Sequence, residues 1–205
     1  MTSTPAILNN EILNRHISDA AAIESTKFKT YNKIFPVNFA LLRVFDAIGT
    51  NLPATAASDD LGWVANTLGT DAPTIQTSDA KNTTVTQKAR GIIIVPDNYI
   101  AGEDLDIIAI AGMKTTIASA SATIDFSAYE VNDADATVGS DLVTTGATTI
   151  NSTTAAAKTF EIDESGLTAG DMLDVLITIA ITDVATATAV IGRIIKLYLA
   201  CDCRG

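Results

Sequence analysis

The side chains most often used in catalysis are scarce in this sequence. His16 is the only histidine, and it lies beside Arg15 near the start of the chain, away from the turns where a site would be assembled. A Ser–His–Asp or Cys–His triad would have to recruit this imidazole across domains, and a metal centre with several imidazole ligands has no second histidine to use. We therefore expect neither nucleophilic catalysis nor a histidine-based metal centre.

Acidic clusters are the next candidates, because paired carboxylates could serve a glycosidase. There are three clusters: Asp59-Asp60, Glu103/Asp104/Asp106 and Asp163-Glu164. Adjacent residues of an extended chain point to opposite faces, so a doublet cannot place both carboxylates on one bond. All three clusters adjoin predicted turns, and Trp63 with four tyrosines offers few rings for a sugar to stack on. We expect solvated surface acids, and a hydrolase is the least favoured function.

Metal and nucleotide motifs are incomplete. The segment from Asp133 through Asp135 begins like an EF-hand calcium loop, but Val138 and Thr144 stand where Gly and Glu are required. The EF-hand interpretation is excluded, while a weaker Ca²⁺ site near Asp133 and Asp135 stays open. Neither GxxxxGK[ST] nor GxGxxG occurs, so the sequence predicts no nucleotide cofactor. Apart from the open Ca²⁺ question, we expect no metal site and no cofactor.

The two cysteines, Cys201 and Cys203, lie two residues apart, and an extended strand would place both on one face. A bridge between them within one chain is awkward at this spacing, and the pair lacks the remaining ligands of a zinc site. We expect reduced, partly buried thiols, with a disulfide between subunits as the alternative.

Composition excludes several classes of protein. The chain has 205 residues, of which 47% are hydrophobic and 18% charged, the opposite of a disordered composition. Its net charge of -11 would repel phosphate, so we expect no nucleic-acid partner. Four charged residues interrupt the most apolar stretch, 172–201, and polar residues interrupt the N-terminal stretch. We therefore expect a soluble protein with no signal peptide and no membrane partner.

Residues 1–35 are predicted to form an extended, partly helical arm. Apolar residues recur there at three- and four-residue steps, which draws a stripe along one side of a helix. Lys27, Lys29 and Lys33 follow and make the arm mildly basic. Such a helix either packs on its own domain or docks on another chain. The candidate contact residues for docking are Ile7, Leu8, Ile12, Leu13, Ile17, Ile23, Phe28 and Tyr31.

From Val37 onward the period changes to the alternation typical of strands. Eight strands are predicted: 37–45, 63–68, 89–95, 105–111, 124–129, 159–162, 173–182 and 191–199. Turn-forming segments without helices separate them, which favours an antiparallel β-sandwich. We predict a mainly β fold, an eight-stranded jelly roll over residues 36–205, with 133–157 as a long surface loop and Trp63 as a core or interface residue.

Five short motifs occur in order along residues 36–205: LPATAASDDL (52–61), LGTDAPTI (68–75), AGMKTT (111–116), GDMLDV (170–175) and LACDCRG (199–205). Together they resemble the capsid decoration, or cement, proteins encoded beside the major capsid gene in tailed bacteriophages. The resemblance implies a jelly-roll body, often trimeric, seated on the outer face of an icosahedral shell, with an N-terminal arm that reaches neighbouring subunits.

The residues and the resemblance together lead to one functional hypothesis. We expect a structural virion protein, not an enzyme, that is made in the host cytoplasm and cements the outer surface of a phage capsid. Its expected partners are several major capsid protein subunits and its own copies in a homotrimer, because many weak contacts made at once give durable binding. The alternative is a carbohydrate-binding or adhesive β-sandwich of a virion appendage, which should show several exposed aromatic residues.

Overall fold

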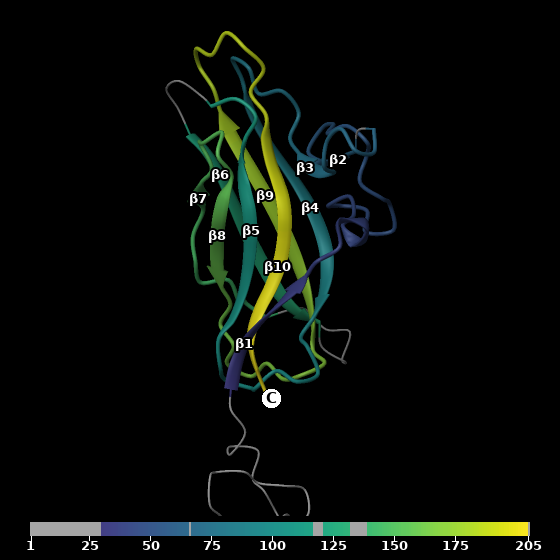
Figure 1. Ribbon diagram of the computed structural model, residues 1–205, viewed down its shortest axis with the longest axis vertical. Coiled ribbons are helices and arrows are strands. Elements are labelled where there is room, and N and C mark those ends of the chain that lie inside the picture. The colour runs from purple at the N-terminus through teal and green to yellow at the C-terminus, as the bar shows by residue number, and fades with distance from the viewer. Residues whose placement is uncertain (1–29, 66, 117–120, 132–138, 205) are drawn as a thin grey trace, which may run out of the picture.

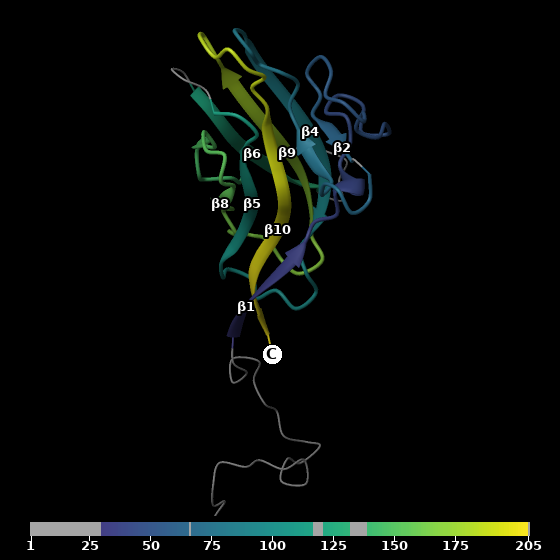
Figure 2. The ribbon, with the colours of Figure 1, turned by 45° about the horizontal axis from the view of Figure 1, so that its top comes forward.

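The computed structural model describes residues 30–65, 67–116, 121–131 and 139–204, and these residues form two antiparallel β-sheets packed face to face (Figures 1 and 2). The elements are β1 (Thr30–Pro36), η3 (Phe39–Leu41), β2 (Gly62–Val64), β3 (Thr74–Gln76), β4 (Thr84–Ile94), β5 (Leu105–Met113), β6 (Ser121–Val131), β7 (Thr148–Thr149), β8 (Ala156–Glu161), β9 (Met172–Thr182) and β10 (Gly192–Arg204). The predicted mainly β, antiparallel sandwich is confirmed. In the described ranges no helix is long and apolar enough to span a bilayer.

The strand order is that of a jelly roll. One sheet runs β2-β3-β10-β5-β8, with β1 also paired to β10, and the other runs β4-β9-β6-β7. The eight strands from β3 to β10 can be numbered 1 to 8 in chain order. In this numbering the first sheet has the order 1-8-3-6 and the second sheet has the order 2-7-4-5. This is the strand order of two Greek keys. Strands β1 and β2 are additions to this eight-stranded body.

The sandwich core follows from the alternation seen in the sequence. Strand β9 buries every second residue from Leu173 to Ile181, and each of these side chains is at most 2% exposed. The rings of Phe126 on β6 and Phe160 on β8 meet at 4.7 Å between centroids and join the two sheets. Each such buried side chain contributes about 1.5–3 kcal/mol of hydrophobic stabilisation. The core is therefore a continuous layer between the sheets.

The strand predicted over 37–45 is wrong. Asn38 accepts a hydrogen bond from the Ala40 amide at 2.9 Å and caps the short 3₁₀ helix η3 instead. Such local side-chain to backbone bonds compete with a strand ladder. Within 37–45, the Val37 amide donates to the Leu197 carbonyl of β10, and Arg43 forms an isolated bridge to Arg90 of β4.

Three strands are missing from the sequence prediction. Strands β3 and β7 hold three and two residues, too few to show an alternating pattern, and β7 lies within the segment 133–157 that was expected to be loop. Strand β1 lies in the segment assigned to the arm, and it pairs with β10 from Thr30↔Arg204 to Pro36↔Tyr198. The described part of the predicted arm is thus a strand of the body, while the division into two domains stays a prediction.

Strands β1 and β3 share one edge of β10. Strand β3 pairs with Arg193 and Ile194, β1 pairs with 198–204, and β10 has an irregularity between Ile194 and Lys196. The chain between them, 37–73, is an excursion that lies against β4, where Arg43 and Arg90 exchange backbone hydrogen bonds of 2.7 and 3.0 Å. It packs closely, because a Cβ added to Gly62 would lie 2.3 Å from the Ala56 nitrogen.

Candidate functional site

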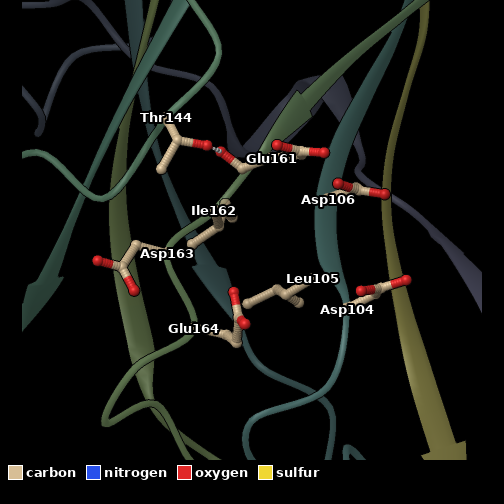
Figure 3. A pocket seen from close by; sticks show the side chains of 8 residues that line it. All are labelled: Asp104, Leu105, Asp106, Thr144, Glu161, Ile162, Asp163 and Glu164. Atoms are coloured by element: carbon tan, nitrogen blue, oxygen red, sulfur yellow. Dashed lines mark hydrogen bonds between the residues drawn. The ribbon is translucent and has the colours of Figure 1, made fainter.

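An acidic pocket of about 370 Å³ lies where β5 begins and β8 ends (Figure 3). It is lined by Asp104, Leu105, Asp106, Thr144, Glu161, Ile162, Asp163 and Glu164. Strand pairing places Asp106 directly opposite Glu161, and Figure 3 shows Asp163 pointing away from the other carboxylates. The pocket therefore gathers acids from two separate stretches of sequence.

The environment of this pocket disfavours the ionised form of one of its carboxyls. Burial raises the pKa of the Asp106 carboxyl, and the nearby charges of Asp104, Glu161 and Glu164 raise it further. Asp163 has the opposite behaviour, because hydrogen bonds from the Ser165 side chain and amide lower its pKa. The pocket would attract cations, but in the described ranges no group of three or more His, Cys, Asp or Glu side chains is arranged to hold a metal ion.

The sequence anticipates this pocket only in part. It identifies Asp104, Asp106, Asp163 and Glu164 as separate solvated clusters, while Glu161 is missed. Only the β5–β8 register brings these groups together. The third predicted cluster, Asp59-Asp60, does not line the pocket, and Asp60 instead accepts a hydrogen bond from the Phe45 amide at 3.2 Å.

Apolar side chains gather along the side of the sandwich where β1 faces β4. A groove of about 270 Å³, the β1–β4 groove, is lined by Phe35, Pro36, Val37, Asn38, Leu41, Ile92, Ile93, Ile94 and Leu199. Leu41 and Ile94 are 54% and 59% exposed. Ile94 lies opposite Met172, which lies opposite Val131, so an exposed apolar row continues across β4, β9 and β6. Exposed patches of this kind mark interaction sites.

A second groove lies on the other side of residues 36–38. This Trp63 groove, of about 420 Å³, is lined by Pro36, Val37, Asn38, Phe39, Trp63, Ala72, Pro73, Ile195, Lys196, Leu197 and Tyr198. Trp63 is half-buried and packs against the core, as expected from the sequence. Its indole Nε1 is buried and has no hydrogen-bond partner among the described residues, which costs about 1–3 kcal/mol.

A smaller depression of about 240 Å³ lies on the outer face of the four-stranded sheet. Phe45 and Tyr129 flank it, and Arg90 and Asp174 form an ion pair in it in which Nε donates to Oδ1 at 2.7 Å. The Asp174 bond raises the pKa of Arg90 further. Two rings beside a fixed donor and acceptor pair are suited to a small polar ligand.

The cysteines lie inside the sandwich. Cys201 and Cys203 are both fully buried free thiols on β10, and their Sγ atoms are 3.5 Å apart. Burial raises the pKa of Cys201 to about 12, with the Cys203 thiol adding to the effect. The two thiols share one face, as the sequence predicts.

Most of the predicted contact residues cannot be placed. Ile7, Leu8, Ile12, Leu13, Ile17, Ile23 and Phe28 lie outside the described residues, as do His16 and the candidate calcium ligands Asp133 and Asp135. Tyr31 lies on β1 opposite Cys203 and is 41% exposed. The apolar residues of the two grooves were not among the candidates. The run of three isoleucines at 92–94, of which Ile93 is buried, Ile92 half-buried and Ile94 exposed, would have pointed to them.

The fold and surface define a jelly-roll β-sandwich protein with an acidic pocket at one end and apolar grooves along one side. No family model matches the sequence, and no curated protein matches it. Among solved structures, a chain of infectious bursal disease virus, Gx strain, aligns over 76% of this chain at 13% identity with a TM-score of 0.30. This chain covers 40% of the length of that viral chain. The likeness is too low to carry a functional inference.

Proposed function

We propose that this protein is a structural virion component that decorates and cements the outer face of an icosahedral phage shell, as a homotrimer and without catalysing a reaction. The observation that carries the proposal is the β1–β4 groove with its exposed rim. Large side chains there remain in water in the isolated chain, and burying them against a coat protein would contribute about 25 cal/mol per Å².

The position of the groove supports multivalent attachment. Residues 1–29 join the body at Thr30, the first residue of β1, whose other end lines the groove. The apolar stripe predicted within that segment supplies a second contact for the same coat lattice. Two weak contacts on one molecule raise the effective concentration of each other, and three copies in a trimer multiply the effect. The motif resemblance to cement proteins points to the same role.

The proposal is tested by cosedimentation with empty phage shells. Replacing Leu41 and Ile94 with Asp should weaken shell binding by more than about tenfold, because a charge cannot be buried without a partner. The matched control replaces Leu68 and Val184, which are 99% and 62% exposed, with Asp. This variant carries the same added charge and should bind like the unmodified protein. Failure of the unmodified protein to sediment with shells, or equal loss in both variants, would reject the role of the groove.

A second candidate function is favoured by the depression between Phe45 and Tyr129. Its rings and the Arg90–Asp174 pair provide the stacking and hydrogen-bonding groups that a neutral sugar residue requires. Glycan-array binding that is lost in Tyr129→Ala would favour an adhesive module over a cement protein. Binding that survives this substitution would assign the sugar to another surface.

A further inference from the structure

We propose that the outer face of the six-stranded sheet binds a second copy of this chain, with the strands of the two copies running in opposite directions. The face consists of three rows of outward-pointing residues that cross β10, β5 and β8 (Figure 1). This contact is separate from the trimer of the proposed function, because a two-fold contact joins copies in pairs and can form without a shell.

The middle row of this face is apolar. Tyr198 on β10 lies opposite Ile108 on β5, and Pro36 of β1 continues the row on the other side of β10. Ala109 is buried in the core, so its neighbours Ile108 and Ile110 point outward, where both are half-buried. Apolar side chains on such a face are removed from water when the face of another sheet packs on it.

One end of the face is acidic. Asp106 lies opposite Glu161, and just beyond this row the Asp202 amide donates to the Asp104 carbonyl at 3.1 Å. Burial, and then the charges of Asp104 and Glu161, raise the pKa of the Asp106 carboxyl. Arg204 ends β10 in this region, but in the described ranges none of the four carboxylates forms an ion pair with it or with another cation. This end of the face therefore carries negative charge that a cation would stabilise.

The opposite end of the face is basic. Lys196 lies opposite Ile110 and is exposed. Arg193 lies opposite Gly112 one row further along, and its Nη2 donates to the Thr153 carbonyl at 3.2 Å. Neither cation forms an ion pair within the part of the chain that the structure describes. The face therefore has an acidic end and a basic end, with the apolar row between them.

This charge pattern selects the antiparallel arrangement of two copies. A two-fold axis that passes between the packed faces at the row of Ile108 and Tyr198 reverses the strand direction. Asp106 and Lys196 each lie one row from that axis, about 7 Å along the strands and on opposite sides of it. Each Lys196 then lies beside the partner's Asp106, whereas a parallel arrangement would place Asp106 against its own copy. Opposite charges across a contact favour the first arrangement and like charges disfavour the second.

The proposal is tested by sedimentation velocity of the full-length protein between about 1 μM and 1 mM, the range in which weak contacts form. The mass should double as the concentration rises. Lys196→Glu and Asp106→Lys should each weaken this association by more than about tenfold, because each places like charges together. The variant that carries both substitutions has opposite charges again and should associate like the unmodified protein.

The matched control is Lys81→Glu, which reverses an exposed lysine in the connection between β3 and β4, outside the face. It should associate like the unmodified protein, and equal thermal midpoints at low concentration should show that every variant is folded. A control that weakens association as far as Lys196→Glu would attribute the effect to net charge and overturn the proposal.

Three further results would overturn it. One is a mass that stays constant over the whole concentration range, and a constant mass of three copies would support the proposed trimer while rejecting this contact. Another is undiminished association in both single reversals. The third is a folded double reversal that does not regain association, which would show that Lys196 and Asp106 do not meet across the contact.

Discussion

Asp106 shows how an acidic pocket can reduce the stability of the fold through a single residue. It lies opposite Glu161 and near Asp104 and Glu164, and burial and these charges all disfavour its ionised form. A carboxyl whose pKa is raised in the folded protein destabilises the fold at a pH above that pKa, and this cost disappears once the group is protonated in both states. The folded protein is thus less stable at neutral pH than its packing alone would give.

We predict that Asp106→Asn raises the thermal midpoint at pH 7 and has no such effect below about pH 3, where the carboxyl is protonated in the folded and unfolded chains alike. The gain should stay below about 1 kcal/mol, because the site is open to solvent. Asp163→Asn is the control within the same pocket. Its pKa is lowered in the fold, so replacing the charged acceptor of the Ser165 hydrogen bonds with a neutral amide should reduce stability at pH 7. Thermal melts of both variants at the two pH values test the signs.

The two thiols should be unreactive in the folded protein. A thiolate is the reacting species, and the raised pKa of Cys201 leaves very little of it at neutral pH. We predict that iodoacetamide modifies neither Cys201 nor Cys203 within the time that fully modifies the chain in denaturant, as measured by intact mass. A dimer band on a non-reducing gel of freshly purified folded protein would instead support a disulfide between subunits.

Residue-scale properties follow from sequence only where they are local. The spacing of Cys201 and Cys203 gives their shared face, since alternation along a strand is local. The acidic pocket cannot be found in this way, because Glu161 and Asp106 meet through a pairing between strands far apart in the chain. The Trp63 indole, which has no hydrogen-bond partner in the part of the chain that the structure describes, is likewise a result of packing and leaves no signal in the sequence.

At the scale of elements, β1 shows how a strand can be held almost wholly by its backbone. Six of its seven residues are exposed, and it pairs with β10 along its full length. The Val37 amide donates to the Leu197 carbonyl at 2.9 Å, so by alternation the amides of Phe35, Lys33 and Tyr31 also point to β10. Pro36, which has no amide proton, occupies a position that points away.

This alternation gives a matched pair of proline substitutions. Lys33→Pro removes an amide that points to β10 and should loosen β1, while Ile34→Pro removes one that points to solvent and should be tolerated. We predict faster hydrogen exchange at the Cys201 amide, opposite Lys33, in the first variant only. Equal exchange rates in the two variants would show that backbone pairing does not hold β1 in place.

Strand length decides which elements the sequence reveals. Strands β9 and β10 are long and alternate clearly, so both are predicted, whereas β3 and β7 are too short to have a period. Strand β1 is hidden for a different reason. Its residues bury little surface, so the hydrophobic pattern that identifies other strands is absent there.

At the scale of the whole molecule, stability rests on the layer between the sheets. Ile177 on β9 is fully buried in this layer, whereas Thr86 on the neighbouring strand β4 is exposed. We predict that Ile177→Asp prevents folding, because it buries a charge without a partner, and that Thr86→Asp leaves a cooperative melt within about 0.5 kcal/mol of the unmodified protein. A normal melt for Ile177→Asp would show that the facing of β9 is wrong.

The spacing of the strands and the lack of a helical pattern between them predict the jelly roll, because both are properties of the whole chain. Neither property predicts that β1 and β3 pair with the same edge of β10. Thr30 and Thr74 lie far apart in sequence, and nothing in either segment encodes a common partner. The excursion from 37 to 73 is therefore not recognised in the sequence, which predicts two strands of the body there, 37–45 and 63–68.

The pairing of Thr30 with Arg204 has a practical consequence for engineering. The first and last described residues leave the body at the same pole, so a short glycine-rich connector between them would turn β1 and β10 into a hairpin. New termini opened in the exposed connection that contains Val184 would then give a circular permutant. In such a permutant, a reporter fused at the new termini would project from the end of the sandwich opposite Thr30 and Arg204.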